Sequence, residues 1–598
     1  MVRALYEYGK AHPEVLKLPG CSDRTIKYVV ELDGVGNFVS IRPSERRTVI
    51  CPDMGGATRG SGTVSNVLME KASISIKLNS GASGKALERV EGKQACFLDY
   101  FRDSSVPEFV AVLHALETDS ILEAIQTEAV NIGVSAGDVV GFAVSGVLLS
   151  DSQAVQAWWS SRPSGDSGAD LSVDVVTGEI CSPVRLFDPV PSSVKIARGG
   201  QASGVSLISF NKPSFESYNK TQGFNSPMSA TTAKIVMDAF NVLGNQAVSL
   251  GDVNFMHWYD CDVDLADDVL LQAFFAFDDV DSSDGPDVDE VAAVSAASAM
   301  ITSPLTGVPP VSLMGRRYYI MIVQPEMSRM VVRSYTTGSY EDLYCNLHAW
   351  FDDMTLVSAF GKGRVKPRKL NALLFALLSV SESKKKSYSD KMKPLSPLVV
   401  PILKACIDNT SLPDAVAVRA LSAIHSGIYN SDNDGYINPV AVQCLKLWLM
   451  RKNKERSCDI MAELNRGCAQ SAYHCGRLLA AYEQVQAQVS PDVNVGVLTK
   501  FYAGCSQSPA LVLGNMQALS VHHFQKFTSK SYRRLYESVL EEIWADLGSE
   551  IPKNLTLEEK AYFALGYWQQ RADLGVRVRA LREELNLKKV GNQNKQEV

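Results

Sequence analysis

The stretch Lys27-Tyr-Val-Val-Glu-Leu-Asp-Gly-Val-Gly-Asn-Phe-Val-Ser-Ile-Arg-Pro43 decides the fold of the N-terminal part of the chain. It contains two runs rich in β-branched and aromatic residues, separated by Asp33-Gly34-Val35-Gly36. Strand-forming runs on both sides of an Asp-Gly turn predict a β-hairpin. Residues 2–12, which precede Pro13, have the spacing of a short amphipathic helix.

Further β-rich segments are predicted at residues 139–149 and 205–210, and helices at residues 109–116 and 121–132. The stretch 162–168 is rich in Gly, Pro and Ser and predicts a connection. These alternations indicate an α+β class, with a mixed α/β N-terminal domain followed by a C-terminal α-helical bundle.

Helical patterns dominate after residue 340. Ser508-Pro509 predicts a helix start, and Thr556-Leu-Glu-Glu559 predicts a capping box for the last core helix. We expect a compact bundle over residues 465–575 and a polar tail from about residue 583. The predicted domains are 1–340 (α+β), 341–460 (a helical and basic linking region) and 461–598 (the helical bundle). Apolar residues recur at helical spacing in two stripes: Leu478, Leu479, Tyr482, Val485 and Val489, and Tyr532, Leu535, Tyr536, Val539, Ile543 and Leu547.

Composition is that of a globular protein, with 46% hydrophobic and 21% charged residues among 598, a length that predicts two to four domains. None of the 12 cysteines forms a Cys-x-x-Cys pair, so we expect reduced thiols, no metal site and no cofactor. No apolar run is long enough to span a membrane, and Arg3, Glu7 and Lys10 do not fit a signal peptide. We therefore expect a cytoplasmic protein.

Sequence patterns for catalysis are weak. Gly81-Ala-Ser-Gly-Lys85-Ala86 has too few residues between its glycines for a phosphate-binding loop. Asp260-Cys-Asp-Val-Asp264 begins like an EF-hand but lacks the required glycine and final acid. Residues 260–290 hold 12 carboxylates and no Lys or Arg. We interpret this segment as a solvated acidic loop, with repulsion of DNA or contact with a basic partner left open. The sequence therefore predicts a protein that is not an enzyme.

Basic residues are clustered although the net charge is −7. Residues 362–393 contain ten Lys or Arg against Glu382 and Asp390. Clustered cations near aromatic side chains predict sequence-independent contact with a nucleic-acid backbone. An ordinary solvated helix face is the alternative. The candidates are Lys362, Arg364, Lys500, Lys526, Lys530, Arg533 and Arg534.

Several blocks follow one another in the order of one known family: MVRALYEYGKA at the start, SGVSLISFNKPSFESYNKTQGFNSPMS at 203–229, LGDVNFMHW at 250–258, the stretch 316–343, AYHCGRLL at 472–479 and FALGYWQQR at 563–571. Together they resemble the large subunit of type I-C CRISPR surveillance complexes (Cascade), of the Csd family. Asn219 stands where that family usually has Gly. The resemblance covers essentially the whole chain.

The resemblance implies a non-catalytic subunit of an RNA-guided complex. Such a subunit holds the CRISPR RNA (crRNA) 5′ handle, reads the protospacer-adjacent motif (PAM) on double-stranded DNA and starts R-loop formation. Base pairing then supplies most of the sequence specificity. Implied partners are the crRNA, the target DNA, the Cascade backbone and crRNA-processing subunits, and a separate helicase-nuclease that cleaves.

The same resemblance points to site residues in the loop Arg59-Gly-Ser-Gly-Thr-Val-Ser-Asn66. Asn66 aligns with a family asparagine, and an amide both donates to and accepts from base edges, which suits a T/A-rich PAM. Thr63 and Ser65 would add hydrogen bonds, and Arg59 a phosphate or minor-groove contact. A turn-capping asparagine is the alternative. Further predicted backbone contacts are Lys195, Arg198, Lys212, Lys220 and Arg571.

In this family the 3′ part of the gene is also translated from an internal start, giving a separate small subunit. Met461 is the expected start here, and Met450 is the alternative. Two other functions stay open on the sequence. One is a protein-only scaffold that does not read DNA. The other is a metal-dependent nuclease that uses carboxylates such as Asp262 and Asp264.

Overall fold

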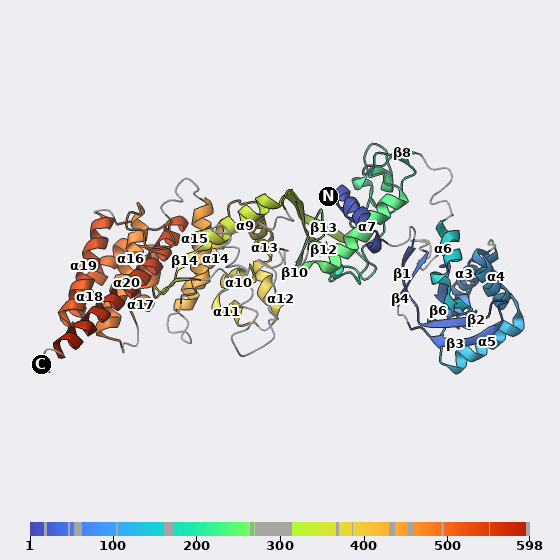
Figure 1. The fold of residues 1–598 in the computed structure, drawn as a ribbon, viewed down its shortest axis with the longest axis horizontal. Helices are drawn as coiled ribbons and strands as arrows, with labels where there is room; N and C mark the ends of the chain where they lie inside the picture. The colour runs from blue at the N-terminus through green and yellow to red at the C-terminus, as the bar shows by residue number, and fades with distance from the viewer. Residues whose placement is uncertain are drawn as a thin grey trace. The chain divides into compact units, whose positions relative to one another are not determined.

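A computed structural model describes residues 1–16, 21–45, 48–52, 62–102, 106–160, 171–263, 268, 314–365, 370–385, 387–429, 437–452, 460–491, 496–548 and 551–593. The chain forms two compact units (Figure 1). Unit 1 comprises Met1–Gln246 and Pro325–Val331, and unit 2 comprises Ala247–Gln324 and Val332–Val598. The predicted functional division at residues 340 and 460 stays a prediction.

The strands of unit 1 build a mixed sheet in the order β3-β2-β6-β5, with β7 paired to β6. β2 runs antiparallel to β3 and parallel to β6, and β5 runs antiparallel to β6. β1 pairs with β4, and β8 pairs with β9. The strands are β1 (Cys21–Thr25), β2 (Tyr28–Leu32), β3 (Phe38–Pro43), β4 (Thr48–Pro52), β5 (Met69–Lys71), β6 (Val139–Val144), β7 (Val147–Leu148), β8 (Ser172–Val173) and β9 (Ile180–Cys181).

Helices pack onto this sheet because packing removes their apolar faces from water. α4 packs against β2 and β6, α5 packs against β3, and α3 packs against α2 and α4 (Figure 1). The rings of Phe97 in α3 and Phe142 in β6 lie 6.3 Å apart in the buried core. The helices of unit 1 are α1 (Val2–Ala11), α2 (Ala72–Ser75), α3 (Lys85–Arg102), α4 (Pro107–Glu117), α5 (Asp119–Asn131), α6 (Gln153–Ser160) and α7 (Ala230–Gln246).

The predicted hairpin is confirmed as β2 and β3. Asp33 closes its turn: Oδ1 accepts from the backbone N–H groups of Val35, Gly36 and Asn37, at 2.8–2.9 Å. These bonds, with that from the Asn37 side chain, lower the pKa of Asp33 to about 2. Gly36 has φ +100° and lies so close to α4 that a Cβ there would be 2.4 Å from the Ala111 carbonyl oxygen. The Asp-Gly stretch therefore shapes the turn and also lets it pack on α4.

The predicted strand at 205–210 is wrong. Val205 and Ser206 form only isolated bridges, to Val190 and Arg329, and the following residues run as irregular chain. Residues 205 and 206 are thus held by single bridges and not by the continuous hydrogen-bond ladder of a β-strand. The predicted first helix and the helices at 109–116 and 121–132 are confirmed as α1, α4 and α5. The predicted connection at 162–168 lies outside the described residues.

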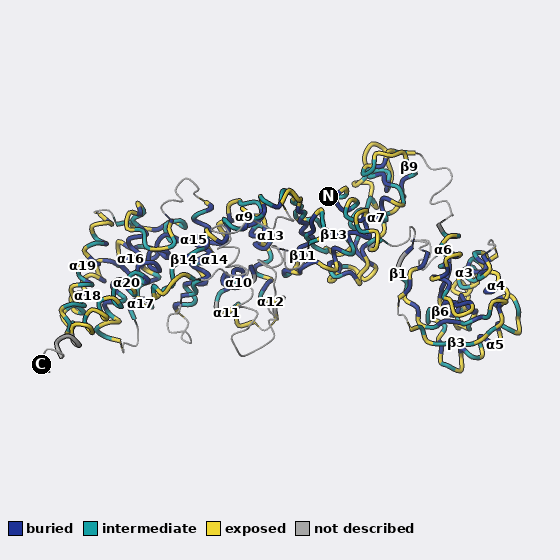
Figure 2. Tube along the Cα trace, viewed as in Figure 1, coloured by how far each residue is buried: buried dark blue, intermediate teal, exposed yellow. Residues whose placement is uncertain are grey.

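A second sheet has the order β10-β11-β12-β13, formed by β10 (Val248–Leu250), β11 (Val253–Tyr259), β12 (Arg317–Glu326) and β13 (Arg329–Ser339). β14 (Leu356–Val357) pairs with β15 (Arg364–Val365). A row of helices follows, most of which contribute residues to one buried core (Figure 2). They are α9 (Tyr340–Met354), α10 (Leu370–Ala376), α11 (Val380–Ser383), α12 (Tyr388–Met392), α13 (Ser396–Ile407), α14 (Asp414–Ile428), α15 (Pro439–Lys452), α16 (Ser471–Val489), α17 (Val497–Gln507), α18 (Pro509–Gln525), α19 (Lys530–Leu547) and α20 (Leu557–Gln593).

The centre of the C-terminal bundle is the contact between α16 and α20. A Cβ on Gly476 would lie 2.0 Å from the Phe563 carbonyl oxygen, and one on Gly566 would lie 2.1 Å from that of Tyr473. Two glycines thus bring the two backbones together. Both belong to the family-like blocks at 472–479 and 563–571. Close packing of the two helices is therefore a physical reason for glycine at both positions.

Helix α20 begins at a capping box and extends into the polar C-terminal segment. The capping box is confirmed: the Thr556 N–H donates to Glu559 Oε2 (2.7 Å), and the Glu559 N–H donates to Thr556 Oγ1 (3.3 Å). The segment from residue 583 is polar as predicted, with its described side chains mostly exposed, and it is helical, because α20 continues to Gln593. Charged residues such as Glu584 and Lys588, which form an i,i+4 pair, are compatible with a solvated helix.

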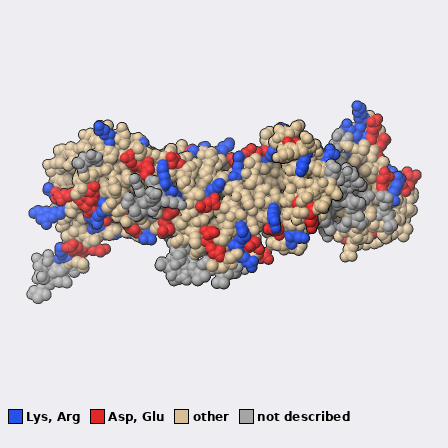
Figure 3. Space-filling model, turned by 90° about the horizontal axis from the view of Figure 1, so that it is seen from above, with Lys and Arg blue, Asp and Glu red and all other residues tan. Residues whose placement is uncertain are grey.

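The α+β class with a C-terminal helical region is confirmed by these elements. In the described part of the chain, no helix is long and apolar enough to cross a bilayer. On the face seen in Figure 3, Lys and Arg side chains alternate with Asp and Glu side chains and do not form one continuous basic surface. A nucleic-acid interface on this face therefore depends on local groups of residues and not on one extended basic surface.

Candidate nucleic-acid interface

The predicted reading loop leads directly into edge strand β5. Its described part starts at residue 62, and β5 follows at Met69. Helix α3 runs beside it: a Cβ on Gly92 would lie 2.8 Å from Thr63 Cγ2. The loop therefore approaches a protein helix at this point. The short helix α2 then returns the chain beneath α3.

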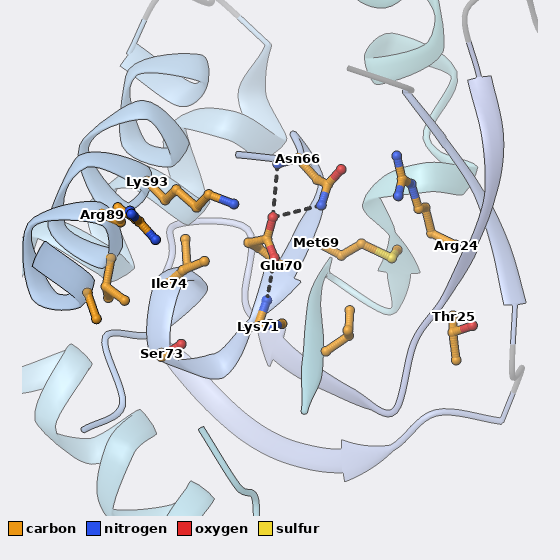
Figure 4. Close-up of a pocket in the computed structure, with 13 residues that line it drawn as sticks. Arg24, Thr25, Asn66, Met69, Glu70, Lys71, Ser73, Ile74, Arg89 and Lys93 are labelled. Atoms are coloured by element: carbon orange, nitrogen blue, oxygen red, sulfur yellow. Dashed lines mark hydrogen bonds between the residues drawn. The ribbon is translucent and has the colours of Figure 1, made fainter. Parts of the chain in front are cut away.

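A cavity of about 590 Å³ lies where these elements meet (Figure 4). Its walls are the end of β1, residues 66–74, Val139 at the start of β6, and one face of α3. The α3 face presents Ala86, Arg89, Val90 and Lys93, which recur at the three- and four-residue spacing of a helix. Segments far apart in the sequence thus share one hollow.

Asn66 and Glu70 meet in the middle of this cavity. Glu70 Oε2 accepts from the Asn66 backbone N–H (3.1 Å) and from Asn66 Nδ2 (2.7 Å), and Glu70 Oε1 accepts from the Lys71 N–H (3.0 Å). The Glu70 side chain is 7% exposed, and these three bonds hold it in place. Because only Nδ2 can donate, the bond to Glu70 determines which way the Asn66 amide faces.

No described residue donates a hydrogen bond to the side-chain carbonyl oxygen of Asn66. Oδ1 is buried and has no hydrogen-bond partner in the described part of the chain. An unpaired buried acceptor costs about 1–3 kcal/mol, and a donor supplied by a bound group would recover that energy. Nδ2 also keeps a second N–H beside the one given to Glu70. The amide is therefore still equipped to accept and to donate, but a ligand reaches Oδ1 only if the oxygen becomes exposed.

Cations surround this pair. Arg89 and Lys93 lie on one side of it and Arg24 on the other (Figure 4), and Lys71 also lines the cavity. Glu70 is the single carboxylate among the lining residues, and it is occupied by three N–H donors. Positive side chains around an amide fit a polyanion whose bases carry hydrogen-bonding edges.

Comparison with known proteins places the chain in a family. Residues 3–575 match the CRISPR-associated protein family Cas_Csd1. The chain belongs to this family. Its members are the large subunits of type I-C CRISPR surveillance complexes, so assembly with other subunits of such a complex is implied. No curated protein matches the chain significantly.

The other predicted PAM residues have different surroundings. Ser65 is fully buried; its N–H donates to Cys96 Sγ, its carbonyl accepts from the Tyr100 hydroxyl, and its Oγ has no hydrogen-bond partner among the described residues. In this conformation Ser65 contacts protein, and a DNA contact by its side chain stays a prediction. Thr63 is exposed beside α3. Arg59 lies outside the described residues.

The four predicted backbone contacts of residues 195–220 do not share one element. Lys195 begins a short 3₁₀ helix, where its N–H donates to Asn245 Oδ1 (3.1 Å), and Arg198 is exposed just after it. Lys212 and Lys220 are exposed on the loop that follows Val205. Their roles stay predictions.

The predicted cations of unit 2 fall into two groups. Arg364 pairs with Glu463 (3.1 Å), Arg533 pairs with Glu537 (2.8 Å), and Arg571 is largely buried beside Tyr567 and Glu483. Arg571 is therefore used within the protein, whereas the side chains of Arg364 and Arg533 stay 63% and 51% exposed in their ion pairs. Side chains that are exposed belong to Lys362, Lys500, Lys526, Lys530 and Arg534.

The acidic segment 260–290 lies mostly outside the described residues. Residues 260–263 and Asp268 are described; Asp268 accepts from the Tyr259 hydroxyl (3.1 Å) and lies 2.5 Å from His257 Nε2. Within the described residues, no group of three or more His, Cys, Asp or Glu side chains has the arrangement of a metal site. At the glycine pair of residues 81–84, the Gly81 N–H donates to Asn79 Oδ1, as in an ordinary turn.

Sequence reasoning missed Glu70, Arg24, Arg89 and Lys93. The helical spacing of Arg89 and Lys93 was a usable pattern, because both fall on one face of α3. No comparable sequence pattern indicated Glu70. Its distance of four residues from Asn66 is meaningful only because the chain turns between them before entering β5.

Proposed function

We propose that this chain is a non-catalytic, PAM-reading large subunit of a type I-C surveillance complex. In this role it binds double-stranded target DNA, reads the PAM through the cavity around Asn66 and starts duplex opening. Base pairing with the crRNA then extends the R-loop. The observation that carries the proposal is the buried Asn66 Oδ1, which has no hydrogen-bond partner among the described residues and lies in a cavity lined by cations.

The chemistry of the pair supports base reading. An asparagine that accepts through Oδ1 and donates through Nδ2 matches the N6–H and N7 edge of adenine. Glu70 orients the amide from the opposite side and leaves one N–H free for the base. Arg89 and Lys93 are placed to neutralise phosphates, which adds affinity but no sequence preference.

The test is duplex binding by the assembled complex with Asn66→Ala. Affinity for PAM-containing duplex is expected to fall by about 1–3 kcal/mol, or roughly 5- to 150-fold, because one base contact is lost. Affinity for duplex without a PAM should stay the same. Asn79→Ala is a matched control, because Asn79 is an exposed asparagine that makes a turn contact near the same helix.

Other outcomes separate the alternatives. Unchanged PAM binding by a folded Asn66→Ala complex would remove Asn66 from the reading role. If no residue of this chain crosslinks to DNA in the assembled complex, the protein-only scaffold is the better function. Metal-dependent DNA cleavage by the purified chain, lost in Asp262→Asn with Asp264→Asn, would show a nuclease.

The C-terminal bundle is proposed to border the path of the target or displaced strand. Lys530, Arg533 and Arg534 occupy the beginning of α19, whose first turn holds no acidic residue. Cations at a helix N-terminus oppose the helix dipole, so their presence favours an external anion such as phosphate. Exposed Lys500 and Lys526 extend the same proposal to α17 and to the end of α18.

We also propose that a separate small subunit starts at Met461. Met461 lies between α15 and α16, and its carbonyl accepts from Gln569 Nε2 of α20 (2.8 Å). A start at Met450 would begin inside α15 and leave a helical remnant. Intact-mass analysis of the expressed gene tests this: a product that begins at Met461 is expected, and a product that begins at Met450 would contradict it.

The remaining proposed partners follow from this role. They are the crRNA with its 5′ handle, the backbone and crRNA-processing subunits, and a helicase-nuclease recruited after duplex opening. Lys195, Arg198, Lys212 and Lys220 are proposed as phosphate contacts to DNA or RNA. Crosslinking of the assembled complex, mapped to residues, assigns each cation to RNA, DNA or neither.

A further inference from the structure

Tyr218 is presented to solvent in an unusual backbone conformation. Its side chain is 95% exposed, and Tyr218, Asn219 and Gln222 have φ of 54°, 56° and 46°. Residues with a Cβ rarely adopt positive φ, and the strain persists only where the surroundings enforce it. Placing a large aromatic ring outward in this way gains nothing for a core.

The loop around Tyr218, residues 211–225, is held by its own hydrogen bonds. Asn225 is the centre: its Oδ1 accepts from the Ser217 N–H (2.9 Å), and its Nδ2 donates to the carbonyls of Lys220 (2.8 Å) and Gln222 (3.0 Å). The Gln222 N–H donates to Glu216 Oε1 (3.0 Å). The strained turn is therefore determined by a network, and we call residues 211–225 the Tyr218 loop.

Contacts from residues outside the Tyr218 loop hold it in place. The Arg329 guanidinium lies 4.4 Å from the centre of the Phe215 ring and donates to Asn211 Oδ1 (2.6 Å). Arg185 Nε donates to Gln222 Oε1 (2.5 Å). A Cβ on Gly223 would lie 1.9 Å from the Val184 carbonyl oxygen, so the loop is seated closely on its support. Tyr218 thus stands on a pre-ordered base.

The charge of the loop and its anchors favours an anionic partner. The loop and its anchors carry four cations, Arg185, Lys212, Lys220 and Arg329. The loop holds one carboxylate, Glu216, which already accepts from the Gln222 N–H. A rigid exposed ring stacks on a nucleobase at low entropic cost, and flanking cations hold the phosphates. Paired bases in a duplex offer no free face except at an end, so the fitting ligand is an unpaired base.

We propose that the Tyr218 loop is a stacking platform for single-stranded nucleic acid. Tyr218 stacks on an unpaired base, and Lys212 and Lys220 neutralise the adjoining phosphates. The inference rests on the proposed role of the chain in a nucleic-acid complex, but not on the PAM reading assigned to Asn66. The two proposals can therefore fail separately.

The experiment measures binding of oligothymidylate and oligouridylate by the full chain and by the assembled complex. Tyr218→Ala is expected to weaken binding roughly 5- to 150-fold with an unchanged salt slope, because stacking releases no counterions. Tyr218→Phe should keep the affinity. Lys212→Ala and Lys220→Ala should each reduce the salt slope by about 0.7. Quenching of a 2-aminopurine base placed in the oligonucleotide should be lost in Tyr218→Ala and kept in Tyr218→Phe.

Tyr218→Gly separates binding from folding. Glycine adopts positive φ without strain, so this variant should raise the thermal unfolding midpoint and still lose oligonucleotide binding. Tyr429→Ala, at a half-exposed tyrosine in unit 2, is the control and should bind like the unchanged chain. Crosslinking from residue 218 in the assembled complex distinguishes crRNA from the displaced DNA strand.

Three results would overturn the proposal. One is equal oligonucleotide affinity of the Tyr218→Ala chain and the unchanged chain. Another is retained 2-aminopurine quenching in Tyr218→Ala. The third is unchanged oligonucleotide binding together with reduced assembly with the other subunits, which would make the loop a protein contact. Loss of PAM preference in Asn66→Ala bears only on the cavity, so it leaves this test unaffected.

Discussion

The Asn66 side-chain amide donates a 2.7 Å hydrogen bond to the Glu70 carboxylate, and its own carbonyl oxygen is left buried without a hydrogen-bond partner in the described part of the chain. One acidic residue thus determines which face an asparagine offers to a ligand. The amide nitrogen is held by a side chain, and the oxygen is not used by the described loop, which supports the proposed reading role over a turn cap.

Glu70→Gln should change PAM preference more than PAM affinity. Glutamine offers both a donor and an acceptor, so the Asn66 amide can face either way and the adenine-matching pattern is lost. We expect discrimination between PAM variants to fall by about 1–3 kcal/mol in a library of PAM duplexes. Glu88→Gln on α3, an exposed acid, should leave it unchanged. A uniform loss across all PAM variants would assign Glu70 a structural role only.

Arg89→Ala should weaken duplex binding equally for all PAM sequences. A phosphate contact carries no base information, and its loss should reduce the slope of log K against log salt by about one. Lys93→Ala is expected to behave alike, because Lys93 lies one turn further on the same helix face. Arg102→Ala at the other end of α3 is the control, since Arg102 pairs with Glu117. A variant-dependent change in PAM preference would contradict the phosphate role.

Gly476→Ala should destabilise the C-terminal bundle by about 3 kcal/mol or more. The new Cβ would lie 2.0 Å from a carbonyl oxygen of α20, so the two helices must separate. Gly514→Ala in α18 is a matched control with nothing within 4 Å of the added Cβ, and it should stabilise by about 0.5–1 kcal/mol. Urea unfolding followed by far-ultraviolet circular dichroism measures both. Equal effects of the two substitutions would contradict the close helix contact.

The β2–β3 turn should lose protection in acid. The pKa of Asp33 is lowered to about 2 because the folded turn donates N–H groups to its carboxylate. A lowered folded pKa stabilises above the unfolded value of 3.8, and this stabilisation is lost as the pH falls through about 2. Hydrogen-exchange mass spectrometry of the hairpin peptide should show a difference between Asp33→Ala and the unchanged chain that is full above about pH 4 and disappears below about pH 2. A pH-independent difference would contradict it.

Much of the fold was predictable, because its elements depend on neighbouring residues. The β2–β3 hairpin follows from strand formers around an Asp-Gly turn, and the Thr556 capping box follows from residues three apart. The strand predicted at 205–210 failed for the opposite reason. Its apolar residues find partners in Val190 and in Arg329, which no local pattern indicates.

The candidate site was only half predictable. The resemblance led to Asn66, but nothing near it in sequence indicates that Arg24, Arg89 and Val139 line the same hollow. Likewise, the block at 203–229 marks the Tyr218 loop, but its strained turn and its support by Arg329 are visible only in the fold.

By itself, the sequence determined the hairpin, most of the helices, the family and the asparagine to examine, because turns, caps and amphipathic stripes arise from residues a few positions apart. Only the tertiary structure decided the partner of Asn66, the cations around it and the exposure of Tyr218. A cavity forms where distant segments meet, and burial with hydrogen bonding across those segments determines which polar groups are satisfied and which stay available to a ligand.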